Sequence, residues 1–197
     1  MLFRSRETVP AWVSSWHGSP ARALLRAGRD ASLEAAVDAL RDEDVRTVLF
    51  FADSLMEHDS LPLPLPSGLV LGGNEPWLAE DIAAIDGNTD VVILCTDGGA
   101  NGAFEPGEGP MSLASALLRA GTRAVCASIF PVSASSGLIS NLLAEHALGQ
   151  DLPQALRAAQ LRLIADGAHP IHWAGWRVLT SLTPATASLE KPSRRPR

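Results

Sequence analysis

The chain has 197 residues, of which 46% are hydrophobic and 19% are charged, and its formal net charge at pH 7 is −6. This composition is typical of one globular domain of ordinary size. An acidic chain is poorly suited to the phosphate backbone, so we expect no nucleic-acid partner. No apolar run is long enough to cross a bilayer, and we expect no membrane partner either.

The cysteine pattern indicates the compartment. Cys95 and Cys126 both lie in apolar strand-like runs, unlike the cysteines of a disulfide-rich secreted domain. The N-terminal residues lack the apolar core of a signal peptide. We therefore expect a cytoplasmic protein with two reduced thiols. The basic residues 184–197 contain proline and arginine, which predicts a disordered tail.

The first half of the chain alternates helical and strand-like patterns. Residues 1–30 hold a weak strand candidate at 11–16 and a short helix at 20–28, and they either complete a sheet or form an interface. Residues 32–40 show helical spacing with Ser32 as the N-cap. The next elements in order are a strand at 45–52, a proline-rich extended loop at 53–67, a short strand at 68–73 and a helix at 75–85 with Pro76 in its first turn.

The second half continues the alternation. Residues 91–95 are apolar without alternation, which indicates a strand buried on both faces. The following elements are a glycine-rich loop at 96–109, a helix opened by Pro110 and stopped by Gly121, a strand at 123–130, helices at 135–149 and 151–167, and a strand at 176–182. This order predicts an α/β domain with a mainly parallel sheet between two helical layers.

Cys95 is the candidate functional residue that this topology singles out. It ends its strand, and sites in parallel sheets lie beyond the carboxyl ends of the strands, whereas Cys126 lies inside its strand. A free cysteine is also a common buried packing residue. Two interpretations of Cys95 therefore stand: a packing residue, or an exposed nucleophile beside backbone N–H groups that lower its pKa.

Other kinds of site find little support. Asp97, Glu105 and Glu108 share a loop but match no calcium-binding spacing, so we interpret them as a solvated acidic loop. The glycines of that loop form no nucleotide-binding pattern, and the two cysteines are not at zinc-ligand spacing. We expect no metal and no cofactor.

Four segments resemble, in order and spacing, the CHAT peptidase family, which is related to caspases and separase. They are "LAEDIAAIDGNTDVVILCTDGG", "GEGPMSLASALLRAGTRAVCASIFPV", "LPQALRAAQLRLI" and "HPIHWAGWRVL". The resemblance covers about residues 32–182. It implies a caspase-like three-layer α/β sandwich over residues 31–183, with a Cys/His dyad on neighbouring strand ends.

The resemblance assigns roles to particular positions. The family's nucleophile pattern, similar to Ser-Ala-Cys-Glu-Thr-Gly, falls on residues 93–98, so it implies Cys95 as the nucleophile position and Gly98 beside the oxyanion or substrate pocket. The family's His-Gly pattern falls on residues 50–55, where Ser54 replaces the histidine and Leu55 the glycine. Serine is no base near neutral pH, and leucine crowds the backbone. The family's acidic pocket position falls on Ser133.

Two functional hypotheses follow. In the first, the protein is a non-catalytic binding or regulatory module for a protein or peptide partner, such as a separately encoded regulatory protein. In the second, it is a cysteine endopeptidase in which Cys95 uses a displaced base such as His58, four residues beyond Ser54. His58 is otherwise an exposed loop residue. The remaining histidines are interpreted as structural or surface residues, with His146 on a helix surface.

Overall fold

A six-stranded sheet forms the centre of the computed structural model, which describes residues 2–3, 26–27, 30–55, 67–72, 76–105, 109–130 and 137–181. The strand order is β11-β10-β7-β3-β1-β2. The strands are β1 (Leu2–Phe3), β2 (Arg26–Ala27), β3 (Thr47–Phe51), β7 (Val91–Cys95), β10 (Ala124–Ser128) and β11 (Trp176–Thr180). Neighbours are parallel except β10 and β11. The predicted mainly parallel α/β sheet is confirmed.

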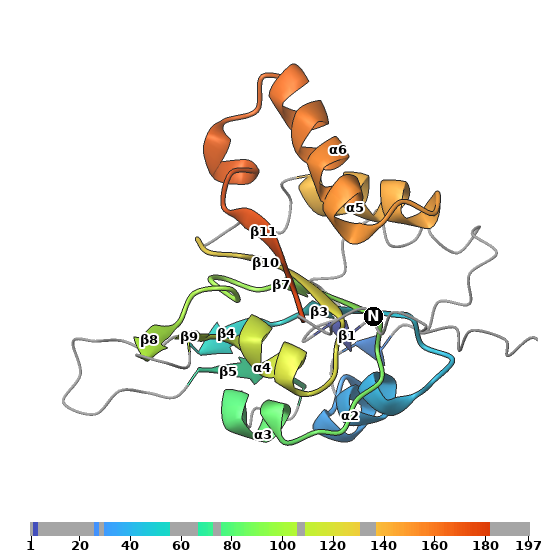
Figure 1. The fold of residues 1–197 in the computed structure, drawn as a ribbon, viewed down its shortest axis with the longest axis vertical. Coiled ribbons are helices and arrows are strands. Elements are labelled where there is room, and N and C mark those ends of the chain that lie inside the picture. The colour runs from blue at the N-terminus through green and yellow to red at the C-terminus, as the bar shows by residue number, and fades with distance from the viewer. Residues whose placement is uncertain are drawn as a thin grey trace, which may run out of the picture.

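Helices cover both faces of the sheet (Figure 1). One layer contains α2 (Leu33–Arg41), α3 (Ala79–Ala83) and α4 (Leu113–Arg119), and the other contains α5 (Leu138–Ala147) and α6 (Leu152–Ala165). Side chains of β7 alternate between two cores: Val92 and Leu94 pack toward α2–α4, whereas Ile93 and Cys95 pack toward α5 and α6. All of β7 is therefore buried, as the absence of alternation in its sequence predicts.

Side-chain caps mark the starts of α2, α4 and α6. Ser32 accepts a hydrogen bond from the backbone N–H of Ala35 and so starts α2, as predicted. Ser112 and Ser115 form a reciprocal capping box at the start of α4. Asp151 caps α6 in the same way as Ser32 caps α2.

Two prolines predicted to open helices lie in strands instead. Pro76 does not open a helix but starts strand β6 (Pro76–Leu78), which pairs with β5 (Gly68–Val70), which in turn pairs with β4 (Asp53–Leu55). Pro110 lies in β9 (Gly109–Met111), opposite β8 (Ala103–Glu105), in a stretch predicted as loop and helix start. Prolines are tolerated in such edge strands because these strands need fewer ladder N–H donors.

The first thirty residues contribute β1 and β2, which extend the sheet beside β3. Residues 26–27, at the end of the predicted short helix, are extended instead. The strand candidate at 11–16, the proline-rich stretch after residue 55 and the tail 184–197 lie outside the described residues. Within the described part of the chain, no helix has the length and apolar character to span a membrane.

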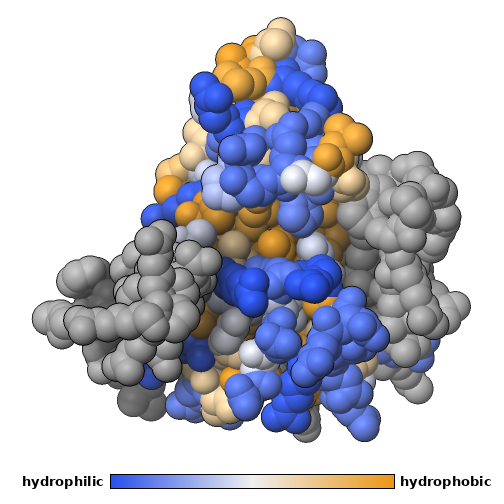
Figure 2. Space-filling model, turned by 45° about the vertical axis from the view of Figure 1, so that its right-hand side comes forward, coloured by the Kyte–Doolittle hydropathy of each residue, from blue (hydrophilic) through white to orange (hydrophobic). Residues whose placement is uncertain are grey.

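The lobe formed by α5, α6 and the 3₁₀ helix η4 (Pro170–His172) projects from the sheet (Figure 1). Its outer surface carries separate apolar side chains with hydrophilic residues between them, seen in the upper part of Figure 2. The largest are Leu148, Leu161, Ile164 and Ile171, each about half exposed or more. Scattered apolar residues of this kind are ordinary on a protein surface.

Candidate functional site

The carboxyl ends of β3, β7 and β10 meet at one edge of the sheet, where β11 begins. The register pairs Phe51 with Cys95 and Ser128 with Trp176. Strand β4 follows β3 after a single residue, so Ser54 reaches the same edge. Its hydroxyl donates a 2.6 Å hydrogen bond to the carbonyl oxygen of Asp97, two residues beyond Cys95. The structure thus brings Ser54 next to the segment that follows Cys95.

Cys95 lies at the end of its strand but is only 8% exposed. Its side chain belongs to an apolar cluster with Phe51, Ile93 and Trp176. Burial, with a smaller contribution from Cys126, raises the pKa of the Cys95 thiol well above its ordinary value. A thiol in this state is neutral near pH 7 and a weak nucleophile. Of the two interpretations of Cys95, the structure favours the packing residue, because the side chain turns into the core under α5 and α6.

Of the other predicted site positions, the structure describes Leu55 and Gly98 but not His58 and Ser133. Leu55 is partly exposed and pairs with Gly68 in the β4–β5 ladder. Gly98 lies in the turn after Cys95 with φ of 60°, and its N–H donates to the carbonyl oxygen of Phe130 at 3.4 Å. His58 and Ser133 lie outside the described residues.

The side chains of His146 and His169 form contacts away from Cys95. His146 is partly buried rather than on the surface, between Thr47 Oγ1 at 3.4 Å and the carbonyl oxygen of Gln150 at 3.0 Å. This contact lies at the start of β3, the opposite end of the sheet from Cys95. His169 caps η4. Among the residues that the structure describes, no histidine is hydrogen-bonded to Cys95.

The turn that follows Cys95, residues 97–100, is held through its main chain. Each of its four carbonyl oxygens accepts a hydrogen bond from a different group. The donors, in chain order of the acceptors, are Ser54 Oγ at 2.6 Å, Asn101 N at 2.7 Å, Ala114 N at 3.0 Å and the Arg177 guanidinium at 2.5 Å. At Gly99 a Cβ would lie 2.7 Å from Thr96 Oγ1 and 3.3 Å from Leu94 Cδ1, so any larger residue would have to displace these side chains.

Arg177 is a member of this site that the sequence analysis missed. It is an exposed residue of β11, and its guanidinium donates to the carbonyl oxygen of Ala100, 77 residues away in the chain. The available signal was a charged residue between apolar neighbours in the run "WRVL". Such alternation indicates one solvent-facing side chain in a strand but does not show what that side chain bonds.

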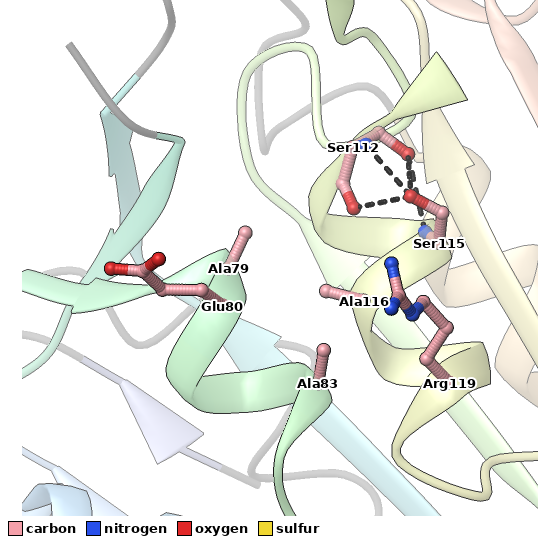
Figure 3. A pocket seen from close by; sticks show the side chains of 7 residues that line it. All are labelled: Ala79, Glu80, Ala83, Ser112, Ser115, Ala116 and Arg119. Atoms are coloured by element: carbon pink, nitrogen blue, oxygen red, sulfur yellow. Dashed lines mark hydrogen bonds between the residues drawn. The ribbon is translucent and has the colours of Figure 1, made fainter. Parts of the chain in front are cut away.

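A separate groove of about 320 Å³ lies between α3 and α4 (Figure 3). Its apolar wall consists of Ala79, Ala83 and Ala116. The hydroxyls of Ser112 and Ser115 are already bonded in the capping box, and Glu80 points away from α4 (Figure 3). This groove does not include Cys95. No group of three metal-binding side chains is found in the described part of the chain.

One comparison with known proteins, the family model, covers nearly the whole chain. The family model of the CHAT domain matches residues 4–181. No curated protein matches the chain. The matched range contains Ser54, Cys95 and Arg177, together with the complete sheet from β3 to β11. Because the family match spans most of the sequence and the α/β architecture agrees with it, the chain belongs to the CHAT domain family.

Proposed function

We propose that this CHAT domain is a non-catalytic binding or regulatory module, and that its partner is a protein or peptide, such as a separately encoded regulatory protein. One observation carries the proposal: the thiol at the nucleophile position is buried, while the residue at the histidine position uses its hydroxyl to bind the carbonyl oxygen of Asp97. Cysteine peptidases need a thiolate and a base that protonates the leaving amine. Cys95 and Ser54 supply neither.

The state of Gly98 also favours binding over turnover. An oxyanion hole requires N–H groups that aim at the developing negative charge. In this structure the Gly98 N–H faces the Phe130 carbonyl oxygen. The turn is therefore organised by internal hydrogen bonds.

We also propose a cytosolic location for the protein. Both cysteines are free and lie in the α5–α6 core. A reducing compartment keeps such thiols in this form.

Alkylation kinetics test the proposal directly. With iodoacetamide at about pH 6 to 7, we expect Cys95 to react at least about tenfold more slowly than an exposed thiol of ordinary pKa. Cys126, which is 0% exposed, is the internal reference for a fully buried thiol. Fast labelling of Cys95 that is lost in His58→Ala would instead support the endopeptidase with a displaced base.

A cleavage assay provides the second arm. The unmodified chain and the Cys95→Ala variant are each incubated with a peptide library. We expect the same products from both, which means no cleavage that depends on Cys95. The variant Ser54→His/Leu55→Gly restores the two family residues. Cys95-dependent cleavage by this variant, and not by the unmodified chain, would show that a histidine and a glycine at these positions are all that the site lacks for catalysis. Cys95-dependent cleavage by the unmodified chain would overturn the proposal.

A further inference from the structure

We propose that Ser54 and Arg177 are positioning residues that clamp the turn at residues 97–100 from two sides and so fix the edge next to Cys95. Ser54 holds the first carbonyl of the turn and Arg177 holds the last. This inference goes beyond the proposed function because it assigns a task to each side chain, independently of whether the edge binds or cleaves a peptide.

The two clamps come from separate parts of the fold. Ser54 belongs to β4 in the small antiparallel sheet, whereas Arg177 belongs to β11, the outermost strand on one side of the central sheet. The Asp97 and Ala100 carbonyl groups that they bind are the outer two of the turn. The inner two carbonyls accept from backbone N–H groups of Asn101 and Ala114. Among the hydrogen bonds described for these four carbonyls, those of the outer two come from side chains and can be removed by substitution.

The chemistry of each clamp suits a positioning role. A serine hydroxyl is short and its hydrogen bond leaves little freedom to the backbone that it joins. The arginine guanidinium is planar and always charged, so its hydrogen bond to a carbonyl oxygen is stronger than a neutral one. Arg177 makes no other hydrogen bond or ion pair among the described residues.

Release of the turn would reach the residues around Cys95. The N–H of Gly98 donates to Phe130, and the N–H of Ala100 donates to the carbonyl oxygen of Ser128 at 2.8 Å. Both bonds tie the turn to the end of β10, the strand beside Cys95. Loss of either clamp should therefore expose these amides and the end of β7 together.

Amide hydrogen exchange of the full chain, followed by NMR, tests this proposal. We expect the amides of Gly98 and Ala100 to exchange about tenfold faster in Ser54→Ala and in Arg177→Ala, in line with the loss of one hydrogen bond. The double variant should exchange less than about a hundredfold faster, since both residues hold one turn. Arg177→Lys keeps a charged donor and should restore part of the protection.

Matched variants separate the clamp from general stability. Ser140→Ala removes a 2.7 Å serine-to-carbonyl bond at Gly137, and Arg123→Ala removes an exposed arginine at the opposite edge. Neither should change exchange at Gly98 or Ala100. The alkylation rate of Cys95 relative to that of Cys126 should also rise about tenfold in the two clamp variants, because local opening of the turn exposes the Cys95 thiol but not the Cys126 thiol.

The outcomes are decisive in both directions. Unchanged exchange at Gly98 and Ala100, or equally faster exchange throughout β7 and β10, would overturn the clamp. Multiplicative effects in the double variant would show two independent contacts and would also overturn it. Cleavage by the unmodified chain bears only on the proposed function and leaves this result in place.

Discussion

The two edges of the central sheet are built from different interactions. At the amino edge, Asp90 pairs with Arg46 at 2.6 Å and with Arg123 at 3.1 Å, and both arginine side chains are more than 70% exposed. At the carboxyl edge, Ser54 and Arg177 bond main-chain carbonyls. Exposed ion pairs are screened and mobile, whereas a side chain bonded to a turn fixes the path of the backbone. The edge that carries Cys95 and Ser54 is thus the one held through its main chain.

The amino edge has its own rigid element, which is backbone packing rather than charge. Gly121 has φ of 102°, and a Cβ there would lie 2.3 Å from the carbonyl oxygen of Gly87. The N–H of Gly87 in turn donates to the Ala120 carbonyl oxygen at 2.7 Å. Two loops therefore approach each other as closely as glycine permits.

Gly121→Ala should give the largest effect on stability. We expect a loss of about 3 kcal/mol or more in the free energy of unfolding, since strain at positive φ adds to a backbone clash. Urea denaturation measures it. Gly167→Ala is the control, because Gly167 has φ of 71° but no heavy atom within 4 Å of its Cβ position. The control should lose only about 1 kcal/mol. Equal losses would show that the clash does not matter.

Alkaline pH should give the second-largest effect on stability, through the two thiols of the α5–α6 core. Burial raises the pKa of both Cys95 and Cys126. The unfolded chain releases these protons near the ordinary value of 9.0, while the folded chain keeps them. The folded state then binds more protons, so stability is full below about pH 8.5 to 9 and falls above it, by up to about 1.4 kcal/mol per pH unit for each thiol.

The composition makes this measurement clean. The chain has no tyrosine, and Lys191 is its single lysine, so few other side chains titrate in the same range. Unfolding curves between about pH 8 and 10 should show a slope that is halved in Cys95→Ala. A flat profile, or an unchanged slope in that variant, would place the Cys95 thiol in contact with solvent.

Asp90→Asn should give the smallest effect. It removes both exposed ion pairs of the amino edge, and we expect the unfolding midpoint to move by little more than the error of measurement. The shift should shrink further at high salt. A loss as large as that of Gly121→Ala would mean that charge, and not backbone packing, holds this edge.

Much of the framework was predictable because its signals are local. Strand β7 agrees with its prediction residue for residue, since five apolar residues without alternation leave little choice. The cap at Ser32 agrees as well. The meeting of Ser54 with the segment after Cys95 followed from the resemblance, whose strand positions imply neighbouring ends.

The features that the sequence left open or predicted wrongly depend on information that is not local. The burial of Cys95 depends on Phe51 and Trp176, which reach it through strand register and helix packing. Strands β1 and β2 have two residues each, too few to show any periodicity. Pro76 and Pro110 suit a first helical turn as well as an edge strand, and the tertiary pairing decides between them.

The separation of the two clamps along the chain has a consequence for biosynthesis. The Ser54 contact closes a loop of 43 residues, and the Arg177 contact closes one of 77. A chain that leaves the ribosome from its N-terminus can make the first contact while β11 is still inside the exit tunnel. During that interval the Asp97 end of the turn can be bonded while the Ala100 end still lacks its hydrogen bond from Arg177.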